Sequence, residues 1–530
     1  MQQNLANPNI TRVFVLMLEN RSFDHMLGFS GLTGTDPPTG SNTPINGVGP
    51  ASANTYLGIN YSATNNADNI MPFDPGHEFP DVVEQLCGAG VQYGGGAYPP
   101  INNSGFVSNY ATTRSSGEGG ATANFGEIMK CYDPAVQLPI LTALAENFAV
   151  CDHWYASLPG PTWPNRFFVH AASSDGLDHS PTTLETTDWE VIDGFSFSNG
   201  TLYQLMDNHK NTNKGWRLYR GVNNPLIGSL PCVAALKGIH LGDTHRYEDF
   251  ESDIHGDYPY SYTFIEPNYG DIINSSYAGG QSQHPTDDVR NGEALIKSTY
   301  EAIRNSPLWL NSLLVITYDE HGGFYDHVAP PAATAPGDTA PNSKFNKYGF
   351  DFQRYGVRVP ALVISAYTAK NHISHQVYDH SSVPATVEAL FHLPSLTQRD
   401  ASANNLTSLA SLVTARTDTP ATLPPVAAVA SIAAVPSTAA VPSTARGTGE
   451  QPATAPSARI VQNEDIASAD SGNLPGFLHI ALKAKREQEG NETNKTMMKG
   501  DFTARVNSKA DARKYLEASL PDLLTTSQNK

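Results

Sequence analysis

The sequence predicts an α/β fold, with a central, mostly parallel sheet flanked by helices. An unbroken apolar run over residues 13–18 and a mostly apolar run over residues 312–318 have the length of strands and are too short to cross a membrane. Runs without alternating polar residues are typical of strands buried on both faces. A helical pattern over residues 287–305 leads into the second run, which is the crossover that a parallel sheet requires.

The remaining segments add helices, strands and long loop insertions to this sheet. Apolar positions at helical spacing predict helices over residues 79–86, from residue 138, over 201–209 and over 384–391. Apolar runs predict strands near residues 148–151, 214–220, from 263, and over 361–365. Gly, Pro, Asn, Thr and Ser dominate residues 33–69 and 88–120, and residues 182–253 show little other pattern, so loops are expected there.

Composition changes sharply after the main domain, which is expected to span residues 1–415. Residues 419–445 contain no charged side chain and are rich in Ala, Val, Thr and Pro, so a linker is expected over residues 416–460. Residues 461–530 contain two amphipathic helical patterns and are expected to form a small helical tail. The tail either docks on the body, which is the favoured interpretation, or binds another molecule.

Charge and composition exclude some classes of protein. A net charge of −19 and a pI near 5.3 argue against a general nucleic-acid binder, which needs a basic surface. The four cysteines form no CxxC pair, which excludes a standard zinc knuckle and permits one or two disulfides. No signal peptide and no transmembrane segment is visible, so secreted and cytoplasmic locations both stay open.

Polar side chains stand where the two long apolar runs end. Glu19 and Asn20 follow the first run, and Asp319 and Glu320 follow the second. The carboxyl ends of parallel strands are where open α/β sheets build their sites. Adjacent buried acids repel each other, and a bound divalent cation relieves that repulsion. The structural alternative is that Glu19 caps a turn, Asn20 bends the chain, and the acidic pair forms salt bridges.

A hydroxyl at the start of a helix supplies the third element. Thr162 lies at the expected N-cap of a helix that begins near Trp163, with Pro164 in the first turn. Such a hydroxyl is often only a cap. The same geometry aims backbone N–H groups and the positive end of the helix dipole at a bound phosphate, so Thr162 is also a candidate nucleophile.

Four segments in this order resemble a known family: ENRSFDHMLG, GPTWPNRFF, SQHPTDDVRNGE and YDEHGGFYDHV. They are similar to the bacterial phosphoesterases that include haemolytic-type phospholipases C and respiratory-burst-inhibiting acid phosphatases. The similarity covers residues 10–400 and implies an alkaline-phosphatase-like fold. It also implies a hydroxyl nucleophile, which is Thr in the phospholipase branch and Ser in the acid-phosphatase branch.

The resemblance implies a role for each matching position. The residues that match the metal ligands of one divalent cation are Glu19, Asn20, Thr162, Asp319 and Glu320. The residues expected to be catalytic are Thr162, His284 and His77, and those expected to bind substrate are Asn165 and His321. Oxygen ligands suit calcium, magnesium or manganese and do not exclude zinc. Arg166 and Arg21 are either phosphate clamps or structural ion-pair partners.

These features together favour a metal-dependent phosphoesterase that works through a phosphothreonine intermediate. Thr at position 162 favours a phospholipase C that acts on a phospholipid head-group ester. One alternative is an acid phosphatase of broad specificity, and another is a non-catalytic binding protein on the same fold. The expected partners are a phospholipid or a small phosphate ester, with peripheral membrane contact left open and no nucleic acid.

Overall fold

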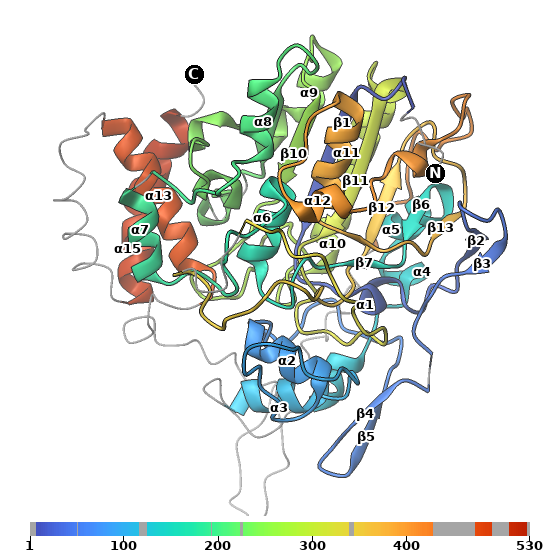
Figure 1. Cartoon of the computed structure of the whole chain (residues 1–530), viewed down its shortest axis with the longest axis vertical. Coiled ribbons are helices and arrows are strands. Elements are labelled where there is room, and N and C mark those ends of the chain that lie inside the picture. The colour runs from blue at the N-terminus through green and yellow to red at the C-terminus, as the bar shows by residue number, and fades with distance from the viewer. Residues whose placement is uncertain are drawn as a thin grey trace, which may run out of the picture.

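The structure, a computed structural model, describes residues 7–49, 51–115, 124–191, 193–222, 226–338, 344–427, 472–489 and 508–526. Its centre is a ten-stranded sheet with the order β3-β2-β13-β6-β12-β11-β1-β10-β8-β9 (Figure 1). The strands are β1 (Arg12–Leu18), β2 (Thr33–Thr35), β3 (Asn42–Pro44), β4 (Ala53–Tyr56), β5 (Ile59–Ser62), β6 (Ala149–Cys151), β7 (Trp154–Tyr155), β8 (Trp216–Arg220), β9 (Thr244–Arg246), β10 (Tyr262–Glu266), β11 (Ser312–Tyr318), β12 (Ala361–Ile364), β13 (His372–Ser374) and β14 (Tyr378–Asp379).

Strand β1 lies in the middle of this sheet, between β10 and β11, and runs parallel to both. The side chains of residues 13–18 are at most 1% exposed, as expected for a strand covered on both faces. Strand β12 pairs antiparallel with β11 and with β6, whereas β8, β9 and β13 join their neighbours in parallel. The predicted α/β class with a mostly parallel sheet is confirmed.

Helices flank the sheet in two contacting groups (Figure 1): α5, α9 and α10 form one, and α6, α8 and α11 the other. The α-helices are α1 (Phe23–Leu27), α2 (Phe79–Cys87), α3 (Phe106–Ser115), α4 (Pro134–Gln137), α5 (Pro139–Asn147), α6 (Thr162–Ala171), α7 (Thr183–Val191), α8 (Leu202–Asn208), α9 (Phe250–His255), α10 (Val289–Asn305), α11 (Ser382–Phe391), α12 (Gln398–Ser402), α13 (Leu474–Glu489) and α15 (Lys509–Thr526). The 3₁₀ helices are η1 (Phe125–Met129), η2 (Leu226–Ser229), η3 (Cys232–Ala235), η4 (Leu241–Asp243), η5 (Tyr247–Asp249), η6 (Trp309–Asn311) and η7 (Thr407–Ala410).

All three of the expected loop segments contain regular structure. The segment over residues 33–69 forms β2, β3 and the hairpin of β4 and β5, residues 88–120 include helix α3, and residues 182–253 include α7, β9 and the start of α9. The strands β2 to β5 have three or four residues each, and their Asn, Thr and Gly content lacks the apolar alternation by which longer strands are recognised. Antiparallel pairing with a neighbour therefore creates strands that local composition does not indicate.

The C-terminal helices dock on the body. Helix α13 contacts α7, η3 and α15, and the red helices lie beside α7 in Figure 1. The ammonium of Lys483 in α13 donates hydrogen bonds to the carbonyl oxygens of Ala234, Leu236 and Ile239, at 3.1, 2.7 and 2.6 Å. This agrees with the docked interpretation of the tail.

The start of the predicted linker also packs on the body. Tyr300 and Lys297 of α10 donate to the carbonyl oxygens of Pro420 and Leu423, at 2.6 Å each. The remainder of the predicted linker, from residue 428, lies outside the described residues.

All four cysteines are buried and unpaired. Burial raises the pKa of the Cys131, Cys151 and Cys232 thiols well above the ordinary value, which keeps them protonated and unreactive.

Among the helices of the described residues, none combines the length and the hydropathy that crossing a bilayer requires.

A buried acid on α11 makes the stability depend on pH. Glu388 is 4% exposed, and burial, together with a hydrogen bond to Asp400, raises its pKa from 4.5 to about 9. Between these two pKa values the folded chain holds a proton that the unfolded chain releases, so stability falls as pH rises through this range. We expect Glu388→Gln to keep the hydrogen bond to Asp400 and to lose this contribution to the pH dependence of stability. The melting temperature of the variant should therefore fall less steeply than that of the wild type between pH 5 and 9, and parallel curves would contradict the shift.

Candidate active site

The polar residues that follow β1 and β11 meet at one edge of the sheet. Leu18 lies opposite Tyr318 in the parallel register, so the residues after both strands leave the sheet at the same level. The backbone N–H of Asn20 donates to Asp319 Oδ1 at 3.1 Å, and the Asn20 amide donates to the Glu320 carboxylate. Asn20 has a φ of 61°, a left-handed conformation that asparagine tolerates better than most residues. The structure thus brings Asn20, Asp319 and Glu320 into direct contact.

The chain after the acidic pair approaches Asn20 so closely that only glycine fits. Gly322 has a φ of 63°, and a Cβ on it would lie 2.2 Å from the carbonyl oxygen of Asn20. Its N–H donates to Glu320 Oε2 at 2.7 Å. The glycine after the acidic pair therefore fixes the orientation of the Glu320 carboxylate.

Arg166 connects acids from three neighbouring strands. Its Nε donates to Asp319 Oδ2 at 2.9 Å, after β11, and its Nη2 lies 3.9 Å from Glu19 Oε2, after β1. Its Nη1 lies 3.7 Å from Glu266 Oε2, at the end of β10. All four side chains are at most 1% exposed. Of the two roles expected for Arg166, the structure shows the ion-pair partner.

The acids outnumber this one guanidinium, and the pKa values of Glu19 and Asp319 are raised. Burial and the neighbouring charge of Asp319 raise the pKa of Glu19 well above its ordinary value. Burial raises the pKa of Asp319 to about 7, although Arg166 partly opposes the shift. Buried negative charge of this kind favours an added cation.

Thr162 is the first residue of α6, and Pro161 is the N-cap. The hydroxyl therefore does not occupy the expected capping position. It is buried and has no hydrogen-bond partner among the described residues. A buried hydroxyl normally finds a partner because leaving it unpaired costs stability. Its place in the first turn leaves it beside the unpaired N–H groups and the positive end of the helix dipole.

Asn165 holds the loop that leads into Thr162. Its Oδ1 accepts the N–H of Leu158 at 3.1 Å, and its Nδ2 donates to the carbonyl oxygens of Gly160 and Pro161 at 2.9 and 3.0 Å. With both ends of the amide engaged in this way, the side chain has little capacity left for a substrate. Its contacts indicate that it positions Thr162.

The two histidines expected near the phosphate lie together and differ in charge. The rings of His77 and His284 are 6.4 Å apart, and His284 stacks on Tyr277 at 3.4 Å. Burial, followed by the charges of His77 and Arg21, holds the pKa of His284 well below its ordinary value. Burial also acts to lower the pKa of His77, but the charges of nearby acids outweigh it and raise this pKa to about 10. His77 is therefore charged and His284 neutral near neutral pH.

Arg21 fixes the backbone of His284. It donates to the carbonyl oxygens of Gln283 and His284 at 2.7 and 3.1 Å, and its guanidinium lies over the ring of Phe324.

His321 receives its orientation from helix α2, because its Nε2 donates to Gln85 Oε1 at 2.7 Å. The amide nitrogen of Gln85 donates to the Gly76 carbonyl oxygen, which leaves only its oxygen to face the histidine.

Comparison with known proteins shows which family these features belong to. Residues 10–394 match the family described as the Phosphoesterase family. The chain belongs to the phosphoesterase family. It is therefore a phosphoric ester hydrolase. Among curated relatives of this phosphoesterase, non-specific phospholipase C3 of Arabidopsis thaliana is 35% identical over 446 residues, which cover 79% of the chain and 76% of the relative.

A mycobacterial relative and distant solved structures also match the phosphoesterase. Phospholipase C B of Mycobacterium tuberculosis is 27% identical over 440 residues, 76% of this chain and 77% of the relative. A solved protein of the alkaline phosphatase superfamily from Vibrio parahaemolyticus covers 50% of the chain and 64% of its own length, at 13% identity and a TM-score of 0.29.

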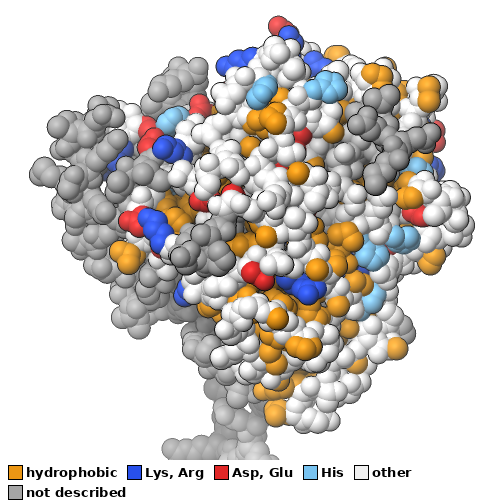
Figure 2. All heavy atoms as spheres, in the orientation of Figure 1, with side chains coloured by type: hydrophobic (Ala, Val, Ile, Leu, Met, Phe, Trp, Pro, Cys, Tyr) orange, Lys and Arg blue, Asp and Glu red, His pale blue; other side chains and the backbone are white. Residues whose placement is uncertain are grey.

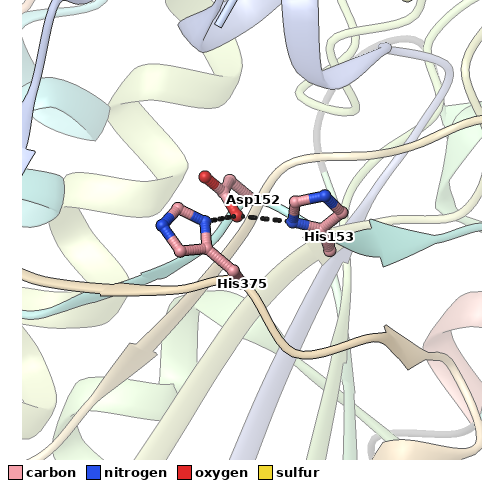
Figure 3. Close-up of side chains that lie close together, drawn as sticks. All are labelled: Asp152, His153 and His375. Atoms are coloured by element: carbon pink, nitrogen blue, oxygen red, sulfur yellow. Dashed lines mark hydrogen bonds and ion pairs between the residues drawn. The ribbon is translucent and has the colours of Figure 1, made fainter. Parts of the chain in front are cut away.

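The phosphoesterase has a second cluster of side chains of the kinds that ligate metals. It consists of Asp152, His153 and His375 (Figure 3). Asp152 Oδ1 accepts hydrogen bonds from Nδ1 of both His153 and His375 at 2.8 Å each. The far nitrogen of His375 contacts Thr43 Oγ1 at 2.7 Å, and that of His153 contacts Asn46 Nδ2 at 3.3 Å. Each ring nitrogen thus has a partner within the chain. The cluster is a complete hydrogen-bond network that ties β6 to the loops around it.

A third cluster surrounds Arg358. Its guanidinium donates to Asp24 Oδ1 at 2.9 Å and to Asp326 Oδ1 at 2.8 Å, and His327 Nδ1 lies 2.7 Å from Asp24 Oδ2. This buried arginine neutralises the acids. Among the described residues, these two clusters are the groups of three or more His, Cys, Asp or Glu whose donor atoms lie within 4.8 Å of one another, and Glu19, Asp319 and Glu320 do not form such a set.

The oxygen atoms of the expected metal ligands nevertheless have the chemistry that a divalent cation requires. Glu19 Oε1, Asn20 Oδ1 and Thr162 Oγ1 are buried and have no hydrogen-bond partner among the described residues. All are oxygen atoms, which calcium, magnesium and manganese prefer. Unpaired buried oxygens beside acids of raised pKa are what an added divalent cation would satisfy.

The docked tail reaches residues next to the site. Asn473, just before α13, donates to the Tyr277 hydroxyl at 3.0 Å, and Tyr277 stacks on His284. The ring of Phe477 lies 5.5 Å from that of Trp163, which follows Thr162.

Sequence reasoning did not assign roles to Glu266, Gln85, Tyr277 or Asn473. A signal existed for Glu266, because its predicted strand ends in a polar residue as β1 and β11 do. The other three reach the site through folding alone, from a helix, a loop and the tail.

Proposed function

We propose that this phosphoesterase is a phospholipase C, which hydrolyses the ester between glycerol and the phosphorylated head group of a phospholipid. The observation that carries the proposal is the Thr162 hydroxyl, which is buried without a hydrogen-bond partner among the described residues, at the start of the helix whose Arg166 pairs with Glu19 and Asp319. The choice of lipid rests on the relatives that are named phospholipases C.

Glu19, Asn20, Thr162, Asp319 and Glu320 would together hold one divalent cation. When bound, such a cation lowers the pKa of a coordinated hydroxyl and offsets the negative charge of a phosphodiester. Arg166 holds Glu19 and Asp319 in place by pairing with both.

In the first step, the Thr162 oxygen attacks phosphorus, and the bond from phosphorus to the glycerol oxygen breaks. Neutral His284 accepts the threonine proton, and charged His77 donates a proton to the departing diacylglycerol. Water then attacks the phosphothreonine and gives a proton to His77, while His284 returns its proton to Thr162 and the phosphorylated head group leaves. His321 binds the substrate, and Asn165 positions the nucleophile.

The proposal is tested by comparing two substrates with the purified full chain. We expect release of phosphocholine from phosphatidylcholine to exceed release of phosphate from a simple aryl monoester. We also expect a chelator to remove the activity and a divalent salt to restore it. Preferred cleavage of the monoester would show an acid phosphatase instead, and hydrolysis of neither substrate would favour the non-catalytic alternative.

A further inference from the structure

The turn between β4 and β5 has an unusual residue at its tip. Tyr56 pairs with Ile59, so Leu57 and Gly58 form a two-residue turn, and their φ angles are 49° and 77°. A turn with positive φ at both positions favours Asn, Asp or Gly. A leucine pays a steric penalty in this conformation. The sequence therefore places an aliphatic side chain at the tip against the local backbone preference.

The tip is also the most concentrated exposed apolar feature of the described residues. Leu57 is 79% exposed and Ile59 is 56% exposed, two positions apart on one hairpin. The other exposed large hydrophobic residues in the described part of the chain stand singly, at Ile70, Val136, Leu184, Leu310 and Val413. Single exposed apolar residues are ordinary on soluble proteins, whereas a projecting pair indicates a contact surface.

The segment that carries the tip has no charge. Residues 37–67 contain no Asp, Glu, Lys or Arg, although the whole chain has a net charge of −19. An anionic surface would repel such a protein, and the hairpin offers no cation to attract one. An uncharged, aliphatic tip fits a surface of low net charge with an apolar interior.

The hairpin is fixed to the helices that contact the active site. Asn54 in β4 accepts the N–H of Phe106 at 3.0 Å, at the start of α3, and the ring of Tyr56, next to the turn, lies 5.7 Å from that of Phe125. Helix α3 bonds to α2 through Asn109 and Gln85 at 2.8 Å, and the same Gln85 orients His321.

The hairpin projects on the side of the active site. In Figure 1 it extends from the same end of the molecule as α1, α2 and α3. Helix α1 closely follows β1, so this is the end at which the active-site strands terminate. Figure 2, in the orientation of Figure 1, shows that apolar side chains also gather over the lower part of the face in view.

We propose that the β4–β5 tip inserts Leu57 and Ile59 into the surface of a zwitterionic phospholipid bilayer and holds the active site against its substrate. The proposal rests on the proposed function in one respect, since a bilayer is where a phospholipase finds its substrate. Aliphatic side chains on a projecting tip enter the acyl boundary of a bilayer.

The test is a double variant, Leu57→Asn with Ile59→Thr, assayed by co-sedimentation of the full chain with phosphatidylcholine vesicles. We expect its partition onto vesicles to fall about tenfold or more, because two aliphatic side chains no longer enter the lipid. We expect its melting temperature to stay the same or rise, because asparagine favours positive φ and threonine suits a strand. Loss of binding therefore cannot be attributed to unfolding.

The matched control is Leu310→Asn with Val413→Thr, which changes two exposed aliphatic residues elsewhere and should bind as the wild type does. Equal binding by the hairpin variant and the wild type would overturn the proposal. So would wild-type binding that requires anionic lipid, or a hairpin that instead mediates self-association in the absence of vesicles.

A soluble substrate separates this proposal from the proposed function. On short-chain phosphatidylcholine below its micelle concentration, kcat/KM of the hairpin variant should equal that of the wild type. An equal loss on the soluble substrate and on vesicles would show that the hairpin supports the active site instead, and would overturn membrane insertion. A wild type that binds vesicles but hydrolyses neither form of lipid would contradict the phospholipase assignment alone.

Discussion

Replacing Thr162 by alanine is expected to reduce kcat by about 10³-fold or more, because the variant lacks the oxygen that forms the proposed covalent intermediate. The hydroxyl has no hydrogen-bond partner, so its removal should leave the fold and the melting temperature nearly unchanged. Steady-state kinetics on phosphatidylcholine and a thermal melt measure the two effects.

The conservative variant Thr162→Ser keeps the nucleophilic oxygen and should retain far more activity than alanine does. Intact-protein mass spectrometry of acid-quenched reactions should detect a phosphorylated enzyme with serine or threonine at this position and none with alanine. Substantial turnover by the alanine variant would contradict the assignment of Thr162 as nucleophile.

Replacing Gly476 by valine is expected to lower kcat by tenfold or more, although the residue lies in the tail. A Cβ on Gly476 would come within 2.1 Å of Trp163 Cζ2, so α13 or the indole must move. Trp163 follows Thr162 in the first turn of α6, and Asn473 reaches His284 through Tyr277. A displacement of about 1 Å in a catalytic group can cost 100-fold in rate.

The matched control for this substitution is Gly94→Val, since a Cβ on Gly94 meets nothing within 4 Å and its φ is ordinary. Limited proteolysis should cut the tail of the Gly476 variant faster than that of the control. If the tail became more sensitive to protease and kcat stayed at the wild-type value, the docked tail would not contribute to catalysis.

The long elements of the fold follow from local sequence, and several of the short ones do not. The runs that became β1 and β11 are apolar without alternation, and the pattern of α10 is amphipathic over its whole length. These signals are internal to each segment. By contrast, β2 and β3 consist of TGT and NTP, which become strands only because a partner strand lies beside them.

The same distinction applies to the candidate site. Glu19, Asn20, Asp319 and Glu320 stand out because polar residues interrupt strands that are otherwise buried. Arg166 is one of several arginines in the sequence, and only the order β11, β1, β10 shows that three strand ends deliver acids to it. Asn473 gives no local signal at all, because its role depends on where the tail docks.

The central position of β1 has a consequence for how the chain folds. Leu18 pairs with Tyr318, and Asn20 bonds to Glu320 across a separation of 300 residues. At the usual rates of synthesis, a ribosome needs roughly 15 to 60 seconds to make that length of chain. During this interval the buried, mostly apolar strand β1 has no neighbour on its β11 side. Nascent chains should therefore depend on chaperones or on low temperature during expression, and their yield should be limited by this delay more than by the stability of the finished fold.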